Sequence, residues 1–125
     1  QWTGGGVVFA PVPRDYSIKM NKKERRLALK SALTSRVQEN KLIVLDELKL
    51  DEVKTKAMQA VLNNLNVSKA MVVLAENDQN VVLSTRNIPN VITALPNTVN
   101  VFDILKYNTV ILTKAAVATI EEVYA

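Results

Sequence analysis

The sequence predicts an α/β fold in three layers, α/β/α, with a mostly parallel sheet of about four strands and an irregular N-terminal arm. Short apolar runs alternate with helical segments throughout residues 42–125. These runs are rich in Val, Ile and Leu with little polar alternation, which is typical of strands covered on both faces. By contrast, residues 1–19 contain three consecutive glycines and two prolines without such a pattern, which indicates an extended segment.

The predicted elements follow one another in a simple order. Residues 1–20 are expected to form an extended basic arm, and residues 21–125 a single globular domain. The first helix begins after Asn21, its expected N-cap, and Leu29, Leu33 and Val37 recur in it at helical spacing. Strands are then predicted at 42–45, 70–75, 91–95 and 109–113. Helices are predicted at 51–65, 79–87, 101–107 and 115–124. Right-handed crossovers would join the parallel strands.

Charge is distributed unevenly along the chain. Residues 42–125 contain seven Lys or Arg against nine Asp or Glu, whereas residues 1–41 contain nine cations against three acids. The nine are Arg14, Lys19, Lys22, Lys23, Arg25, Arg26, Lys30, Arg36 and Lys41. An excess of this size at one end predicts a polyanion partner for the N-terminal third.

Composition excludes several classes of function. The chain has no cysteine and no histidine, so disulfides, thiol chemistry and the usual transition-metal ligands are absent. We expect no catalytic residues, no metal and no cofactor. No apolar run approaches the roughly 18 residues of a membrane span, so we expect a soluble compartment and no membrane partner. Because the chain opens on Gln1 in a glycine-rich stretch, we also expect residues upstream.

The strongest candidate site is the basic cluster at the start of the first helix, Lys22, Lys23, Arg25, Arg26 and Lys30. Spacing of four residues stacks like charges on one helix face, and cations at a helix start oppose the macrodipole. Both arrangements are unfavourable in isolation, which favours a bound anion. Arg14 and Lys19 extend the cluster into the arm.

The arm adds aromatic and backbone features to this cationic surface. Trp2 would either stack on an unpaired base, since RNA recognition uses aromatic and cationic side chains together, or fold back on the domain as a loop aromatic. The glycines at 4–6 have neither a preceding strand nor the spacing of a nucleotide-binding loop. They indicate close backbone approach or flexibility instead.

A second constellation gives an alternative. Asp46 and Glu47 follow the first strand at the edge where open α/β sheets bind ligands, and Lys114 follows the last strand at the same edge. The two acids would hold magnesium in a receiver-like or nucleotide-binding switch domain. Such a site also requires an acceptor Asp at the end of a middle strand, where this chain has Ala75 and Glu76.

Two long segments resemble the large-subunit ribosomal protein L four family of bacterial type. They read Gln-Trp-Thr-Gly-Gly-Gly-Val-Val-Phe-Ala-Pro-Val-Pro-Arg-Asp-Tyr at 1–16 and Lys-Lys-Glu-Arg-Arg-Leu-Ala-Leu-Lys-Ser-Ala-Leu at 22–33. Three shorter segments agree in order: Lys-Thr-Lys at 54–56, Ser-Thr-Arg-Asn-Ile-Pro-Asn-Val at 84–91 and Leu-Thr-Lys-Ala-Ala at 112–116. The resemblance therefore covers essentially the whole chain.

The resemblance implies a structural protein of the cytoplasmic ribosome that binds large-subunit ribosomal RNA and contacts neighbouring ribosomal proteins, with no small-molecule substrate. It also implies that the arm is the returning strand of a long loop whose tip is missing here. Thr3 and Asn21 depart from the family pattern, which commonly has arginine and proline there. The substitution at Thr3 removes one candidate phosphate contact.

Charge and resemblance thus predict the same surface. We expect a non-catalytic RNA-binding protein whose contacts are Gln1, Trp2, Arg14, Lys19, Lys22, Lys23, Arg25, Arg26 and Lys30. Phosphate contacts would supply most of the affinity, and the shape of folded RNA most of the specificity. Besides the switch domain, a protein-interaction module using the helix 21–37 stays open, and its binding would depend little on salt.

Overall fold

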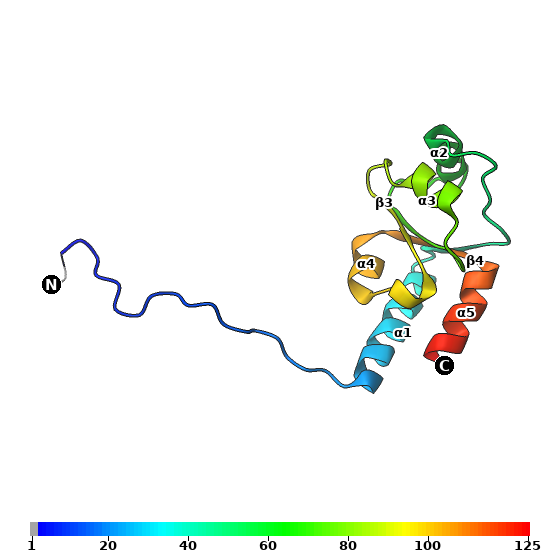
Figure 1. The fold of residues 1–125 in the computed structure, drawn as a ribbon. Helices are drawn as coiled ribbons and strands as arrows, with labels where there is room; N and C mark the ends of the chain where they lie inside the picture. The colour runs from blue at the N-terminus through cyan, green and yellow to red at the C-terminus, as the bar shows by residue number, and fades with distance from the viewer. Residues whose placement is uncertain (1–2) are drawn as a thin grey trace.

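The computed structural model describes residues 3–125 and confirms the predicted α/β fold (Figure 1). Within these residues, four parallel strands form one sheet in the order β1-β4-β2-β3. The strands are β1 (Leu42–Leu45), β2 (Ala70–Val73), β3 (Val91–Ala94) and β4 (Thr109–Thr113). The α-helices are α1 (Lys22–Gln38), α2 (Thr55–Asn64), α3 (Gln79–Thr85), α4 (Val101–Lys106) and α5 (Lys114–Tyr124), and a 3₁₀ turn, η1, spans Pro96–Thr98.

The strand order explains which helices share a face. The connections β1 to β2 and β2 to β3 run in one direction across the sheet, so right-handed crossovers place α2 and α3 on the same side. The connection from β3 back to β4 runs in the opposite direction and places α4 on the other side, with α1 and α5 (Figure 1). The sheet therefore separates two helical layers, as predicted.

Alternation along the two central strands supplies a core to each layer. Met71 and Val73 of β2 pack with Ile104 of α4 in one buried cluster. The side chains of Ala70 and Val72 point to the opposite face of the sheet, where they pack with α2 and α3 in the other cluster. All four β2 residues are buried, which explains why the sequence shows no polar alternation there.

The first helix packs differently from its predicted pattern. All three residues lie in the helix, as predicted, but only Leu29 is buried and Leu33 partly buried, whereas Val37 is 56% exposed. At 100° per residue, position 37 lies about 80° from position 29, whereas Arg36 lies about 20° from it. Arg36 takes the buried place, with a residual exposure of 7%.

Several predicted boundaries also shift. The helix expected from residue 51 begins at Thr55, because Lys54 has an extended backbone with φ −139° and ψ 115°. Strand β2 ends at Val73 and β3 at Ala94, rather than at 75 and 95, because the register between these two strands ends there. Residues 46–54 therefore form a longer loop than predicted after β1.

Two helices end in the same motif, with asparagine in the left-handed region at the position after the cap. Asn40 has φ 55° and Asn66 has φ 54°. After α2, the N–H of Val67 donates to Leu62 O at 3.0 Å and that of Asn66 to Asn63 O at 3.0 Å. This is the Schellman arrangement, which satisfies carbonyls at a helix end and turns the chain toward the next strand.

We expect Asn66→Ala to lower the free energy of unfolding by about 1 kcal/mol, because a Cβ-bearing residue without asparagine's local hydrogen bonding is strained at this φ. Asn66→Gly should leave stability unchanged or slightly higher. Urea unfolding of both variants measures the effect. Asn64→Ala, an exposed change within α2, is the control. Equal stability of the Asn66→Ala variant and the unmodified protein would contradict the assignment.

The arm, residues 3–20, contains no helix or strand in the described chain and extends away from the sheet and its helices (Figure 1). Every described residue of it is exposed. Within residues 3–125, no helix combines the length and apolar character needed to cross a lipid bilayer.

Candidate nucleic-acid interface

The arm presents large apolar side chains to solvent without a partner on the domain. Phe9 is 94% exposed and Ile18 is 93% exposed. Large apolar side chains exposed on a segment that packs against no other part of the described chain are typical of a surface that binds another molecule. Arg14 and Lys19 lie among these side chains, so the covering molecule would meet both apolar and cationic groups.

Local contacts organise the centre of the arm. The guanidinium of Arg14 stacks over the Tyr16 ring, with its central carbon 4.0 Å from the ring centre. The backbone N–H and the hydroxyl of Ser17 each donate to the Asp15 carboxylate at 2.8 Å. These hydrogen bonds, the backbone one foremost, hold the pKa of Asp15 below its usual range. Asp15 therefore offsets part of the arm's positive charge while Arg14 is held on an aromatic plane.

The junction between arm and helix is fixed by hydrogen bonds at the start of α1. Asn21 is the N-cap, as predicted, and its N–H donates to the Glu24 carboxylate at 3.2 Å. Arg25 donates from Nε and Nη2 to the carbonyl oxygen of Met20, at 3.3 and 3.0 Å. Arg25 thus anchors the last residue of the arm, a role that the sequence pattern did not reveal.

The other predicted cations of α1 point into solvent. Lys22, Arg26 and Lys30 run four residues apart along the exposed flank of the helix, and Lys23 is also exposed. In the part of the chain that the structure describes, the acids form ion pairs with Arg36, Lys41, Lys49 and Lys54, and with none of these four cations. Their positive charge is therefore available to a partner.

Two of the nine cations in residues 1–41, Arg36 and Lys41, stabilise the fold and are not part of the exposed basic surface. Arg36 is buried and donates to the carbonyl oxygens of Ile104 and Leu105 at 3.0 and 3.1 Å, which satisfies the end of α4. Its Nη1 also donates to Glu39 at 2.7 Å, and Lys41 pairs with the same carboxylate at 2.9 Å. The basic surface is consequently smaller than the charge count indicated, and it is limited to the arm and the first half of α1.

The alternative site is only partly assembled. Leu45 and Thr113 are register partners in β1 and β4, so Asp46 and Lys114 follow neighbouring strands at one edge, as predicted. Glu47, however, forms an ion pair with Lys49, and Asp78 accepts the N–H of Asn80 at 2.9 Å as the N-cap of α3. Among residues 3–125, no group of three or more acids, histidines or cysteines is placed to hold a metal.

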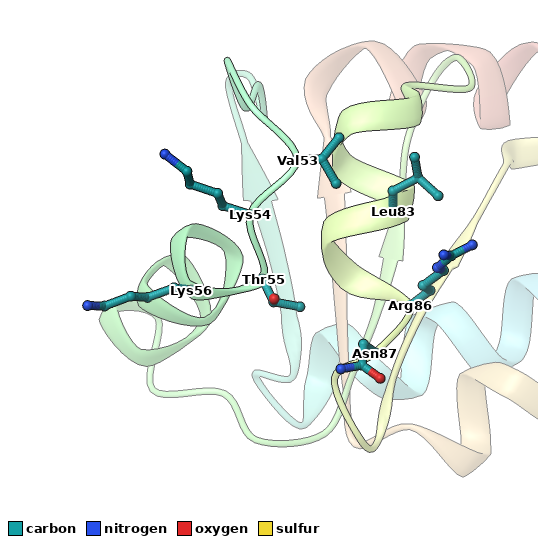
Figure 2. Close-up of a pocket in the computed structure, with 7 residues that line it drawn as sticks. All are labelled: Val53, Lys54, Thr55, Lys56, Leu83, Arg86 and Asn87. Atoms are coloured by element: carbon teal, nitrogen blue, oxygen red, sulfur yellow. The ribbon is translucent and has the colours of Figure 1, made fainter.

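The structure brings together a second basic group that the sequence did not assign to a site. Lys54 and Lys56 lie at the start of α2, and Arg86 and Asn87 at the end of α3. They line one cleft, although about thirty residues separate the two segments (Figure 2). Only the pairing of α2 with α3 reveals this proximity.

Gln1 and Trp2 lie outside the described residues, so their predicted contacts stay predictions.

Comparison with known proteins identifies the family. A model described as the Ribosomal protein L4/L1 family matches residues 1–123. This chain belongs to that family. The result confirms the resemblance noted in the sequence, and the match includes both the arm and the α/β domain.

Relatives agree with the family assignment. The chain is 70% identical to the large ribosomal subunit protein uL4 of Agathobacter rectalis over 125 residues. It is 66% identical to the uL4 protein of Lachnoclostridium phytofermentans and 57% identical to that of a Thermoanaerobacter species. In each comparison the alignment covers the whole chain but 61% of the relative, so the chain spans about three-fifths of these proteins. The assignment gives no support to a receiver-like switch.

Proposed function

We propose that the chain is part of a non-catalytic structural constituent of the large ribosomal subunit in the cytoplasm, and that it binds ribosomal RNA. The observation that carries the proposal is the continuous exposed surface of the arm and the start of α1, whose cations form no ion pair with an acid among residues 3–125. We define this surface as the arm interface, with Arg14, Lys19, Lys22, Lys23, Arg25, Arg26 and Lys30. Family membership supports the same partner.

Each group in the arm interface has a role in this proposal. The exposed lysines and Arg26 neutralise phosphates of RNA, and Arg25 does so with the donors that Met20 leaves free. The Arg14 and Tyr16 stack offers a flat cationic surface to an unpaired base. Gln1 and Trp2 would extend this surface. Exposed apolar residues of the arm pack against RNA or against neighbouring ribosomal proteins.

A salt series tests the proposal. We expect the affinity of this chain for a large-subunit ribosomal RNA fragment to fall steeply with salt, with a log–log slope of about −3 or steeper. Fluorescence anisotropy of labelled RNA at several potassium chloride concentrations gives the slope. An affinity that does not change with salt would contradict phosphate binding, and would favour a protein-interaction surface on α1 instead.

A further inference from the structure

The peptide group that joins the arm to α1 is held from both sides. Its oxygen, Met20 O, accepts hydrogen bonds from Nε and Nη2 of Arg25 at 3.3 and 3.0 Å. Its N–H, which belongs to Asn21, donates to a carboxylate oxygen of Glu24 at 3.2 Å. Two adjacent side chains of opposite charge therefore bind the two ends of one peptide group. We call this arrangement of Glu24 and Arg25 the junction clamp.

The backbone of α1 fixes the junction clamp in place. The backbone N–H of Arg25 donates to Asn21 O at 3.2 Å, which begins the hydrogen-bond pattern of the helix. Asn21 itself is extended, with φ −66° and ψ 148°. Glu24 and Arg25 are thus attached to a regular helix, whereas the peptide group that they hold precedes it. The direction in which the arm leaves α1 follows from the orientation of this peptide group.

Contact between the arm and the domain is limited to this junction. Met20 lines an apolar recess of about 470 Å³ together with Leu29, Val99 and Tyr124, and it is 51% exposed. Ile18, two residues earlier, is 93% exposed. Figure 1 shows the arm extending from the start of α1 without returning to the domain. Contacts near Met20 therefore have to set the direction of the whole arm.

Glu24 is an unexpected residue in a surface that binds RNA, because its charge opposes that of its neighbours. The four cations around it are Lys22, Lys23, Arg25 and Arg26. Glu24 forms no ion pair with them among residues 3–125. A carboxylate in the first turn complements the helix macrodipole, and here it also accepts the Asn21 N–H. This second contact gives the acid a role in the direction of the arm.

A fixed arm direction favours RNA binding for an entropic reason. An arm that moves about its junction must be ordered when RNA binds, and the loss of conformational entropy reduces affinity. The cations of the arm interface lie on both sides of the junction, with Arg14 and Lys19 on the arm and the others on α1. One RNA segment contacts both groups only when the arm has a compatible direction.

We propose that Glu24 and Arg25 are positioning residues, which set the direction of the arm before RNA is present. This inference rests on the proposed function, since RNA is the partner whose binding the junction clamp assists. Glu24 acts through the N–H of Asn21, and Arg25 acts through Met20 O. The remaining donors of Arg25 are available to a phosphate. The basic cluster thus contains an acid because the acid holds the arm.

Two substitutions of Glu24 separate its position from its charge. Glu24→Gln and Glu24→Ala each remove one negative charge, but only glutamine retains a side-chain oxygen for the Asn21 N–H. We expect Glu24→Ala to bind a large-subunit ribosomal RNA fragment about fivefold more weakly than Glu24→Gln does. Both variants should have the same salt dependence, because their charges are equal. Anisotropy titrations measure both, and the pair Glu122→Gln and Glu122→Ala, at an exposed position of α5, is the control.

A distance measurement without RNA tests the direction of the arm itself. The chain has no cysteine, so Ile18→Cys and Thr34→Cys place two nitroxide labels at exposed positions of the arm and of α1. We expect pulsed electron paramagnetic resonance to give a broader distance distribution for Glu24→Ala and for Arg25→Lys than for the labelled chain without these changes. Arg26→Lys makes the same conservative change at the next exposed position and should leave the distribution unchanged.

Two results would overturn the positioning role. One is equal RNA affinity of Glu24→Gln and Glu24→Ala, which would show that Glu24 acts through its charge alone. The other is an unchanged distance distribution in both clamp variants, since any loss of affinity would then come from direct contacts. Failure of the proposed function is separate, because it is seen as a salt-independent affinity of the unmodified chain for ribosomal RNA. Thermal unfolding of each variant checks that the fold is intact.

Discussion

Replacement of Lys22, Lys23 and Arg26 by glutamine is expected to weaken binding to large-subunit ribosomal RNA by about 100-fold at physiological salt. Each phosphate contact contributes about 0.7–0.9 to the exponent that relates affinity to salt, so the log–log slope should become shallower by about 2–3. The three side chains are exposed and form no ion pair among the described residues, so their loss leaves the fold unchanged. Anisotropy titrations across a salt series measure both quantities.

The matched control for this variant is the replacement of Lys49, Lys106 and Lys114 by glutamine, which lowers net charge equally at exposed positions outside the arm interface. We expect the control to reduce affinity by less than about fivefold through the general field of the protein. Equal effects of the two triple variants would show that net charge, rather than the arm interface, controls binding. Arg25 is left unchanged because its bond to Met20 O holds the arm.

Arg36→Met is expected to lower the free energy of unfolding by about 2–4 kcal/mol, the largest effect on stability that we predict. Methionine retains much of the side-chain volume but cannot donate to the carbonyl oxygens of Ile104 and Leu105. These carbonyls end a helix of six residues that has little stability of its own. Urea unfolding followed by circular dichroism measures the loss, and RNA binding of the folded protein should persist.

Two further variants test whether the lost hydrogen bonds to α4 cause the loss of stability in Arg36→Met. Arg26→Met places the same residue on the exposed flank of α1 and should change stability by less than about 0.5 kcal/mol. Glu39→Gln removes the acid that pairs with Arg36 but leaves both carbonyl bonds, and its effect should be smaller than that of Arg36→Met. Unchanged stability of Arg36→Met would show that α4 does not depend on this contact.

The ion pairs of Glu39 with Arg36 and Lys41 also predict that the stability of the fold depends on pH. The hydrogen bond and charge of Lys41, with a contribution from Arg36, hold the pKa of Glu39 below its usual value of about 4.5. The ionised carboxylate therefore stabilises the fold at neutral pH, and this stabilisation is lost as pH falls through the lowered pKa. Arg36→Met should retain part of this dependence, because Lys41 remains beside Glu39.

Sequence patterns predicted the regular elements well for a physical reason. Strands such as β2 are buried on both faces, and their continuous apolar run is a local property of the chain. The start of α1 after Asn21 was likewise visible in local residue preferences. The start of α2 was not, because the backbone N–H of Lys54, which is extended, is held by a hydrogen bond to Ser84, thirty residues away.

In the arm interface too, some features were visible in the sequence and others depended on contacts between distant segments. Its cations were all visible in the sequence, since a solvent-exposed basic row depends only on helical spacing and charge. Sequence alone did not separate Arg36 from that row, because its burial depends on the position of α4. Nor did it indicate that Arg25 holds Met20, a contact that needs the actual path of the chain at the helix start.

The sequence by itself thus determined the α/β class, the arm, the basic helix start and the family resemblance, because each is written in local composition, periodicity or continuous motifs. Only the tertiary structure decided the strand order, the burial of Arg36 and the presence of Lys54, Lys56 and Arg86 among the residues that line one cleft. These features arise from contacts between segments far apart in the chain. Such contacts depend on how crossovers place each helix on the sheet, which no single segment encodes.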